Sequence, residues 1–289
     1  MSNWDGKSKG TAFGYKIFIF AINIFGISSA YFILKIVAFY YYLFAQKNRQ
    51  AILDFYTGAL HIPLKQAKSL CRKNFFIFGQ TLIDRFAFLL GKEAKFTQTF
   101  HNEKYLIEMN QGGKGGILLS AHLGNWETAG NLLKQRITSK INVVMLEAEE
   151  EKIQQLIQNT TGGSKFNIIA IKDDLSHIIK INNALNDNEF IAIHADRHME
   201  GMRFLEMDFL GKKARFPLGP FIIASKFNAP VTFVFALKEG LFHYNLSATI
   251  PVQERLKPEE FARLYIEELE KRVKLNPEQW FNYFNFYQS

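Results

Sequence analysis

Cysteine is almost missing from this 289-residue sequence, which has one, at position 71. A single thiol cannot build an internal disulfide framework, so the working domain is expected in a reducing compartment. The sequence also shows no internal repeat, no low-complexity segment and no clear linker. Its length is enough to bury a sizeable core. These absences leave one large α/β domain or two small ones.

Acidic residues are scarce in the first third of the chain. Residues 1–100 have 13 Lys and Arg against 4 Asp and Glu, whereas residues 101–289 have 22 against 23. The basic excess lies beside the most apolar stretch, in a chain with 29 Phe. This pattern favours contact with an anionic membrane surface, the alternative being a solvated basic face. The aromatic residues form apolar runs and do not interleave with Lys and Arg, so no nucleic-acid partner is expected.

Charge is absent from residues 17–34, which Lys16 and Lys35 bracket. Eighteen helical residues span roughly 27 Å, just enough for a thin hydrocarbon core. We therefore predict a membrane anchor in residues 1–48, either spanning the bilayer or lying in its interface, followed by a larger domain over residues 49–289. Two alternatives stay open, a buried core helix and a signal peptide cleaved near the small residues 28–30.

Strand and helix patterns alternate after residue 115, and residues 50–90 read as helices with one basic face. Strands are predicted at 116–120, 141–146, 167–171, 190–195, 229–237 and 242–250, the last two joined by a hairpin turn at 238–240. Helices are predicted at 127–136, 149–160, 174–186, within 216–228 and at 257–276. The pattern predicts an α/β fold with a mostly parallel central sheet covered by helices on both faces.

A polar pair interrupts one of these strand-to-helix units, "GGILLSAHLGNWETAG". His122 follows the strand and Glu127 opens the next helix, so a turn can bring the carboxylate to the imidazole. Such a histidine could take a proton from an attacking hydroxyl or amine while the carboxylate orients it. Free backbone N–H groups of residues 124–126 could bind an anion. This equipment suits acyl transfer without a nucleophilic Ser or Cys; the alternative is a buried histidine satisfied by Glu127.

A second polar group, "HADRHME", follows the strand at 190–195. His194 and His198, with Asp196 and Glu200, have a spacing that binds zinc when both histidines share one helix face. The preceding apolar residues indicate a strand running into a loop. We therefore expect no metal.

Several stretches resemble the lipid A late acyltransferase family, the lauroyl and myristoyl transferases. "HLGNWE" is similar to the family's His-x-x-x-x-Asp/Glu motif, and the apolar N-terminal segment is similar to its membrane anchor. "HADRHMEG", then "DFLGKKARFPLGPFIIASKFNAPVTFVF" and "NPEQWFNYFNFY", resemble later family stretches in the same order. The resemblance covers nearly the whole chain.

The resemblance implies site residues and partners. His122 would be the general base and Glu127 its orienting partner, with substrate-binding residues at Gly124, Asn125, Asp196, Arg197, Arg215 and Gly219. Arg197 and Arg215 would hold the donor carbonyl or an acceptor phosphate. The acyl donor would be a thioester of acyl carrier protein or coenzyme A, the acceptor a membrane lipid, and no cofactor would be tightly bound. The enzyme would sit at the bacterial inner membrane with its catalytic domain facing the cytoplasm.

This sequence departs from the family at basic positions. An acidic stretch, "LEAEEEK", stands where an Arg is usual, and Asp196-Arg197 replaces an Asp-Gln pair. The C-terminal run has Asn-Phe in place of basic residues. These differences leave three acceptor hypotheses: lipid A or a related outer-membrane lipid, a less charged aminolipid or polyene-type or pigment lipid, or no acceptor at all in a catalytically inactive membrane scaffold.

Overall fold

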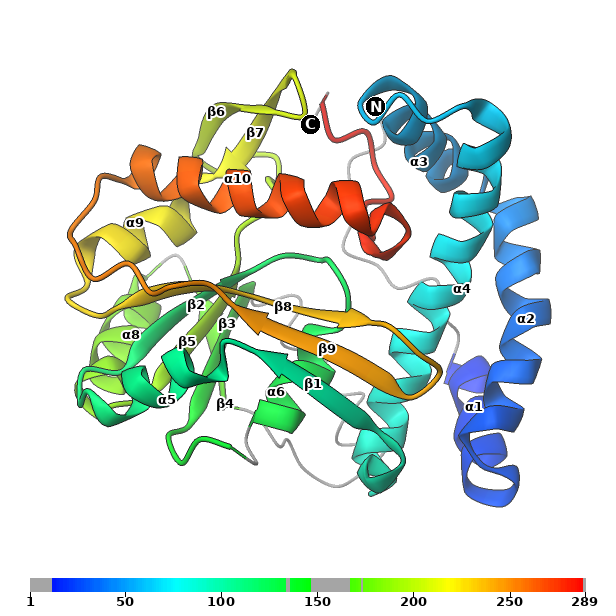
Figure 1. Ribbon diagram of the computed structural model, residues 1–289, viewed down its shortest axis with the longest axis horizontal. Coiled ribbons are helices and arrows are strands. Elements are labelled where there is room, and N and C mark those ends of the chain that lie inside the picture. Colours follow the sequence, from blue (N-terminus) through cyan, green and yellow to red (C-terminus); the bar gives the residue numbers. More distant parts are fainter. Residues whose placement is uncertain (1–11, 134–135, 147–166, 173, 288–289) are drawn as a thin grey trace. The chain divides into compact units, whose positions relative to one another are not determined.

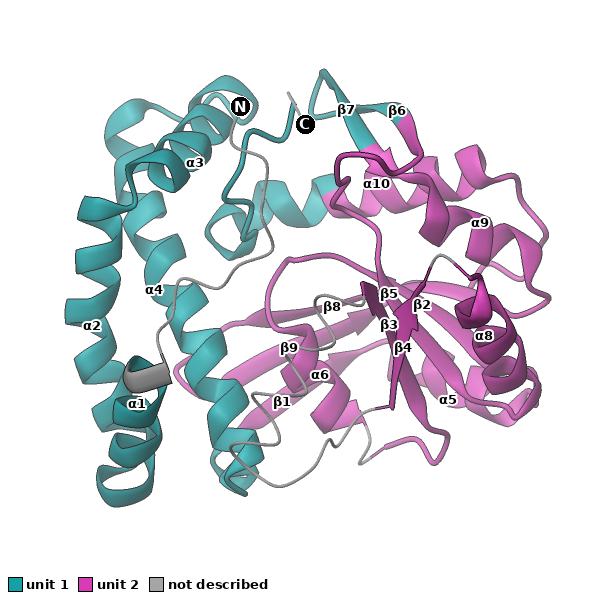
Figure 2. Ribbon diagram, turned by 180° about the vertical axis from the view of Figure 1, so that it is seen from behind, with its two compact units in different colours: residues 1–95, 206–215, 270–289 teal, residues 96–205, 216–269 magenta. Residues whose placement is uncertain are grey.

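A computed structural model describes residues 12–133, 136–146, 167–172 and 174–287. The chain forms two compact units, coloured separately in Figure 2. One unit contains residues 1–95, 206–215 and 270–289, and the other contains residues 96–205 and 216–269. These units do not follow the boundary expected at residue 48, and that division into anchor and catalytic domain stays a prediction.

Helices dominate the first unit: α1 (Ala12–Phe25), α2 (Ile27–Phe44), α3 (Gln46–Gly58) and α4 (Leu64–Leu89). The apolar stretch expected to be one helix is broken at Gly26, whose φ of 83° is a conformation that glycine adopts without strain. By length and composition α2 could cross a membrane. The C-terminal run packs in the same unit, where the Trp280 ring lies 4.6 Å from that of Phe55 and 5.5 Å from that of Phe209.

A seven-stranded sheet forms the centre of the second unit, in the order β1-β9-β8-β2-β5-β3-β4 (Figure 1). Every neighbouring pair is parallel except the β8–β9 hairpin. The strands are β1 (Thr97–His101), β2 (Gly116–Ser120), β3 (Ile141–Leu146), β4 (Asn167–Ile171), β5 (Phe190–His194), β8 (Val231–Lys238) and β9 (His243–Ala248). The helices around the sheet are α5 (Glu103–Gln111), α6 (Trp126–Leu133), α8 (Ser176–Asn186), α9 (Leu218–Lys226) and α10 (Pro258–Leu275), whose last residues belong to the first unit.

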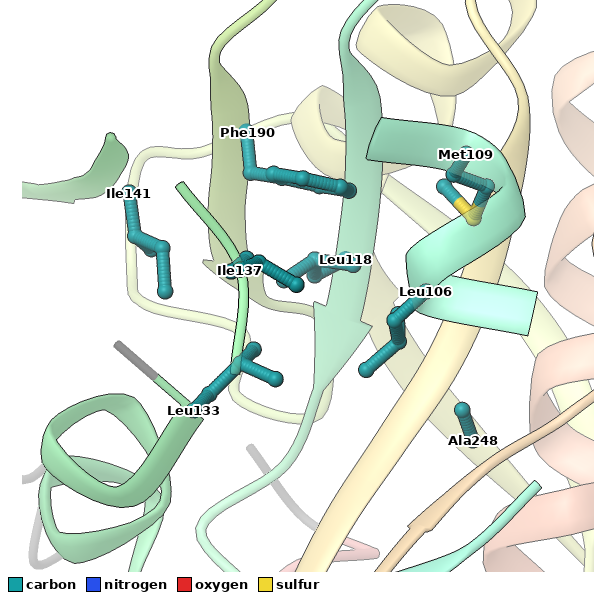
Figure 3. Packing of buried hydrophobic residues seen from close by; sticks show 8 residues of the cluster. All are labelled: Leu106, Met109, Leu118, Leu133, Ile137, Ile141, Phe190 and Ala248. Carbon is teal, nitrogen blue, oxygen red and sulfur yellow. The ribbon is translucent and has the colours of Figure 1, made fainter. Parts of the chain in front are cut away.

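Apolar side chains join the helices to the sheet. On one face, Leu106 and Met109 of α5 and Leu133 of α6 pack with Leu118 of β2 and Phe190 of β5 (Figure 3). Elsewhere, the Tyr265 ring of α10 lies 5.7 Å from the Phe221 ring of α9 and 5.7 Å from the Phe233 ring of β8. Because its strands are buried between helices, β2 is apolar at four of its five positions and buried at all five.

The predicted α/β class, the mostly parallel sheet and the apolar N-terminal helix are confirmed. The sequence analysis missed β1, whose alternating exposed and half-buried residues are mostly polar, and the hairpin of β6 (Phe204–Phe209) and β7 (Lys212–Pro217). The helix expected at 149–160 lies outside the described residues. The fold thus places the strand-to-helix turn at 121–125 beside the carboxyl end of β5.

Candidate active site

Two neighbouring strands of the sheet deliver the central polar pair. β2 and β5 run parallel with Ser120 opposite His194. Two residues beyond this pair, the same register brings His122 next to Asp196. The carboxyl ends of parallel strands are where such sheets present ligand-binding and reacting groups.

Asp196 holds His122 by two hydrogen bonds. The imidazole Nδ1 lies 2.8 Å from Oδ1, and the backbone N–H of His122 donates to Oδ2 at 3.0 Å. The Asp196 side chain is 1% exposed and that of His122 is 23% exposed. An ionised carboxylate only accepts hydrogen bonds, so Nδ1 must carry the proton. Nε2 is then the nitrogen that can accept a proton from a substrate.

The Asp196 carboxyl is held in its ionised form. Burial alone would raise its pKa, but the charge and hydrogen bond of His122, together with the charge of Arg197, hold the pKa well below its usual value. The site therefore contains a buried anion hydrogen-bonded to Nδ1 of a half-buried imidazole. This is the electrostatic arrangement that stabilises an imidazolium when the base takes up a proton.

A second histidine lies against the first. The rings of His194 and His122 have centroids 4.3 Å apart, and Nδ1 of His194 lies 2.9 Å from the Ser120 hydroxyl. The Trp126 ring packs edge-on against His194, with ring centroids 5.2 Å apart. Burial, and then the charge of His122, hold the pKa of His194 well below its usual value. His194 is therefore held in its neutral form.

The lowered pKa of His194 predicts a loss of stability in acid. Above about pH 6.5 both the folded and the unfolded forms carry a neutral His194. As the pH falls below that value the unfolded chain binds a proton that the folded chain refuses, so the free energy of unfolding should drop by up to about 1.4 kcal/mol per pH unit from this group. Between pH 5 and 8, the free energy of unfolding measured with denaturant should change less steeply with pH in His194→Gln than in the native protein. The same substitution at His243, on β9, is the control, and an equal change of slope there would contradict the assignment.

The turn at residues 123–126 is bound to strand β8 of the sheet. Gly124 has a φ of 76°, and a Cβ placed there would lie 1.9 Å from the carbonyl oxygen of Ala236. The next backbone N–H, that of Asn125, donates to this same oxygen at 2.8 Å. The expectation that this N–H is free for an anion is therefore wrong, because the turn uses it to bind β8.

Asn125 is buried and begins α6. Its Oδ1 accepts a hydrogen bond from the backbone N–H of Thr128 at 3.2 Å, and its Nδ2 donates to the Tyr244 hydroxyl at 3.1 Å. An asparagine that satisfies the first turn of a helix is an N-terminal cap. The structure thus gives Asn125 a structural task, and its predicted contact with substrate stays a prediction.

Glu127 does not occupy the position expected for it. It lies in the first turn of α6 and is 7% exposed, but the carboxylate at Nδ1 of His122 belongs to Asp196. The physical reason is the register between β2 and β5, which brings the Asp196 carboxylate next to His122. Glu127 lies further along the chain from His122, in the first turn of α6. The catalytic role predicted for Glu127 stays a prediction.

The other predicted site residues fall in different places. Arg197 follows Asp196, is half-buried, and acts electrostatically on both Asp196 and His194. Gly219 lies exposed in the first turn of α9, with open space where a Cβ would stand. Arg215 lies exposed on β7, in the first unit. Within the second unit, the structure therefore gathers His122, Asp196 and Arg197.

Sequence reasoning missed the support behind this pair. The fully buried Tyr265 donates a hydrogen bond to the carbonyl of Ser120 at 2.9 Å and so fixes the end of β2. Ser120 in turn contacts His194. One signal was available, because Ser120 and His194 each end an apolar strand, but only the strand order shows that these strands are neighbours.

His122, His194 and Asp196 are also the described group best arranged for a metal ion. Each offers a ligand atom, and these atoms lie within 4.8 Å of one another. Two imidazoles and a carboxylate suit zinc. The hydrogen bond between His122 and Asp196 engages two of these ligand atoms, whereas Nε2 of His194 is buried without a hydrogen-bond partner among the described residues. The expectation of no metal stays a prediction.

An apolar cavity opens beside the site, between the sheet and α6. Its lining includes Ser120, Ala121, Leu123 and Trp126, which surround His122 in the sequence. Other lining residues come from α5, α6 and three strands, β2, β3 and β9: Leu106, Leu118, Leu133, Ile141, Val143 and Leu246. A cavity with so few polar groups offers water few hydrogen bonds and favours an apolar occupant.

Comparison with known proteins supplies the reaction class. A family model described as bacterial lipid A biosynthesis acyltransferase matches residues 6–286. A comparison with curated proteins found no match. The family model spans both units, including the strand ends that carry His122 and Asp196. The chain is thus an acyltransferase, a member of the bacterial lipid A biosynthesis acyltransferase family.

Proposed function

We propose that the protein moves a fatty acyl chain from a thioester donor to a hydroxyl or amine of a lipid acceptor, with His122 as general base. The observation that carries this proposal is the His122–Asp196 pair, which sets Nε2 of the imidazole as the proton acceptor. The chain neighbours of His122, Ala121 and Leu123, line an apolar cavity. Nε2 takes the proton of the acceptor while its oxygen or nitrogen attacks the thioester carbonyl. The C–S bond then breaks, and the imidazolium returns the proton to the leaving thiolate. Asp196 stabilises the imidazolium between these steps.

The cavity supports a fatty acyl substrate. Its walls are almost entirely apolar, and they include two small residues of α6, Ala129 and Gly130. We therefore expect Gly130→Leu to favour shorter acyl chains, because one added side chain displaces several methylene groups. Competition between donors of different chain length would measure this, with Asn182→Leu on the exposed side of α8 as the control. An unchanged chain preference in Gly130→Leu would place the acyl chain elsewhere.

The donor is proposed to be an acyl thioester of acyl carrier protein or coenzyme A. Family membership supports lipid A or a related outer-membrane lipid as the acceptor. The acidic stretch at 147–151, which lies outside the described residues, favours a less charged acceptor, an aminolipid or a polyene-type or pigment lipid. Arg197, beside the histidine pair, is the better placed of the two arginines to contact an anionic group.

We place the enzyme at the bacterial inner membrane with its catalytic unit on the cytoplasmic side. The basic first third of the chain and the exposed apolar side chains of α1 and α2 support a membrane location. The single buried cysteine is consistent with the reducing side.

An acyl-transfer assay over a panel of lipid acceptors tests the function. The full-length protein would be supplied with acyl carrier protein and coenzyme A thioesters in separate reactions, and products would be identified by mass spectrometry. His122→Ala provides the inactive comparison. A protein that transfers to no acceptor, and whose deletion leaves cellular lipids unchanged, would be a membrane scaffold and not an acyl-transfer enzyme.

A further inference from the structure

Helix α2 has two faces, one of which is committed to the protein. Its buried residues are Ile27, Ala30, Tyr31, Leu34 and Ala38, a spacing that lines one side of a helix. This side packs along α4, and Figure 1 shows the two helices running beside each other. The opposite side of α2 is therefore the side available for contact with solvent, lipid or another protein.

The contact with α4 is close and partly polar. A Cβ at Gly79 of α4 would lie 2.3 Å from the Leu34 side chain, so the glycine permits the two helices to approach. The Tyr31 hydroxyl donates a hydrogen bond to the fully buried carboxylate of Asp84. A polar contact of this kind makes the pairing specific, because a buried carboxylate without its donor is costly. Hence α2 and α4 are expected to move as one element.

The open side of α2 exposes many large apolar side chains, and their contact with water is unfavourable. Of the seventeen exposed large apolar residues in the described part of the chain, ten lie between residues 17 and 44. On α2 they are Phe32, Ile36, Phe39, Tyr40, Leu43 and Phe44, and α1 adds Ile17, Phe20, Ile24 and Phe25. An apolar stripe along two consecutive helices marks an interaction surface. We call these ten residues the outer face.

Charge on and around the outer face selects an anionic partner. Residues 6–53 contain six Lys and Arg and no Asp or Glu. Lys16 and Lys35 are both exposed within this stretch, beside Ile17 and Ile36. A basic helix pair with an apolar side is the pattern that binds the interface of an anionic bilayer.

We propose that α1 and α2 lie in the plane of an anionic phospholipid bilayer, with the outer face immersed and α4 on the aqueous side, and that α2 does not cross the membrane. Lys35 is the ninth of the eighteen residues of α2, so a crossing helix would set its charge at the centre of the hydrocarbon. A crossing would also take α4 with it, and α4 exposes Lys65, Lys68, Arg72 and Lys73. In the plane of the interface all of these ammonium and guanidinium groups reach water or lipid phosphates. This inference rests on the membrane location proposed above and adds its geometry.

Site-directed spin labelling can measure the depth of α2. The native thiol of Cys71 is buried, and burial raises its pKa to about 12, so a label added to the full-length protein reacts at an introduced cysteine. The variants Ile36→Cys and Leu43→Cys sit on the outer face, and Lys68→Cys on α4 is the aqueous control. The labelled proteins would be bound to vesicles of phosphatidylethanolamine and phosphatidylglycerol, and label depth read from collisions with oxygen and with a water-soluble relaxant.

The two orientations give different depths. In the plane, the labels at positions 36 and 43 should have equal depth, with position 68 in water. In a crossing helix the label at 36 should lie about 10 Å deeper than the label at 43, and this result would overturn the inference. Failure to bind the vesicles, with formation of a dimer in solution, would also overturn it and assign the outer face to a second copy of the chain. Acyl transfer to a detergent-dispersed acceptor, measured on the same variants, separates a failure of this geometry from a failure of the proposed function.

Discussion

Acyl transfer by the His122→Ala variant is expected to fall by roughly 10²- to 10⁴-fold in kcat/KM, the range that a general base contributes. Alanine removes Nε2 of His122, the nitrogen of this partly exposed imidazole that the hydrogen bond to Asp196 leaves free to take a substrate proton. The fold should survive, because the His122 side chain is partly exposed and the backbone N–H that binds Asp196 remains. Steady-state kinetics with the best acceptor should show the loss of activity, and thermal unfolding should show that the variant keeps its fold.

Asp196→Asn is expected to lose nearly as much activity by a different route. The backbone N–H of His122 is a fixed donor, so the amide oxygen must take the place of Oδ2. The amide NH₂ then faces Nδ1 and donates to it, which forces the imidazole proton onto Nε2 and blocks the base. The loss should appear mainly in kcat, since the variant keeps the shape of the site.

Glu127→Gln is the matched comparison for this pair. If Asp196 orients His122, the amide at position 196 should cost far more activity than the amide at position 127. The reverse ranking would return the orienting role to Glu127 and would make the contact between His122 and Asp196 structural. Full activity of His122→Ala would refute general-base catalysis at this site altogether.

Gly124→Ala is expected to destabilise the fold by roughly 2 to 4 kcal/mol, as a substitution that combines backbone strain with an atomic overlap. An alanine Cβ would lie 1.9 Å from the carbonyl oxygen of Ala236 and 2.8 Å from its carbonyl carbon, and neither backbone atom belongs to a flexible side chain. The positive φ of Gly124 adds strain of its own. The turn would have to leave β8, which breaks the hydrogen bond from Asn125 to Ala236 and displaces His122. Denaturant unfolding and acyl-transfer assays should both show the loss.

Gly219→Ala provides the control for a glycine-to-alanine change. A Cβ there meets nothing within 4 Å, and position 219 lies in the first turn of α9. Alanine is the better helix former, so stability should stay the same or rise slightly. If both variants lost similar stability, crowding at Ala236 would not be the cause. A selective loss of activity in Gly219→Ala would instead support its predicted contact with substrate.

Most of the sheet could be predicted from the sequence because its central strands are buried on both sides and are therefore apolar. Continuous apolar runs at β2, β3 and β5, separated by helical patterns, predict a parallel sheet directly. β1 escaped prediction because it has only one apolar residue among its five, Phe100. The break at Gly26 escaped because the apolar pattern continues through it, and only the positive φ reveals the turn.

The site was half predictable for a related reason. Local sequence places His122 at a strand end and Glu127 at the start of a helix, and both placements hold. Pairing Asp196 with His122 needs the knowledge that β5 lies next to β2, and strand order depends on contacts across the whole sheet. The occupied N–H of Asn125 likewise depends on β8, more than a hundred residues further along.

The 74-residue separation between His122 and Asp196 has a consequence for how the enzyme comes into being. Neither half of the pair can be positioned until β2 and β5 have paired, a non-local step that must first overcome the entropy of closing a long loop. During refolding, enzymatic activity should therefore return later than helical circular dichroism. A nascent chain on the ribosome holds His122 without its hydrogen-bond partner until residue 196 has emerged, and helices α1 to α4 are made well before the protein can catalyse a reaction.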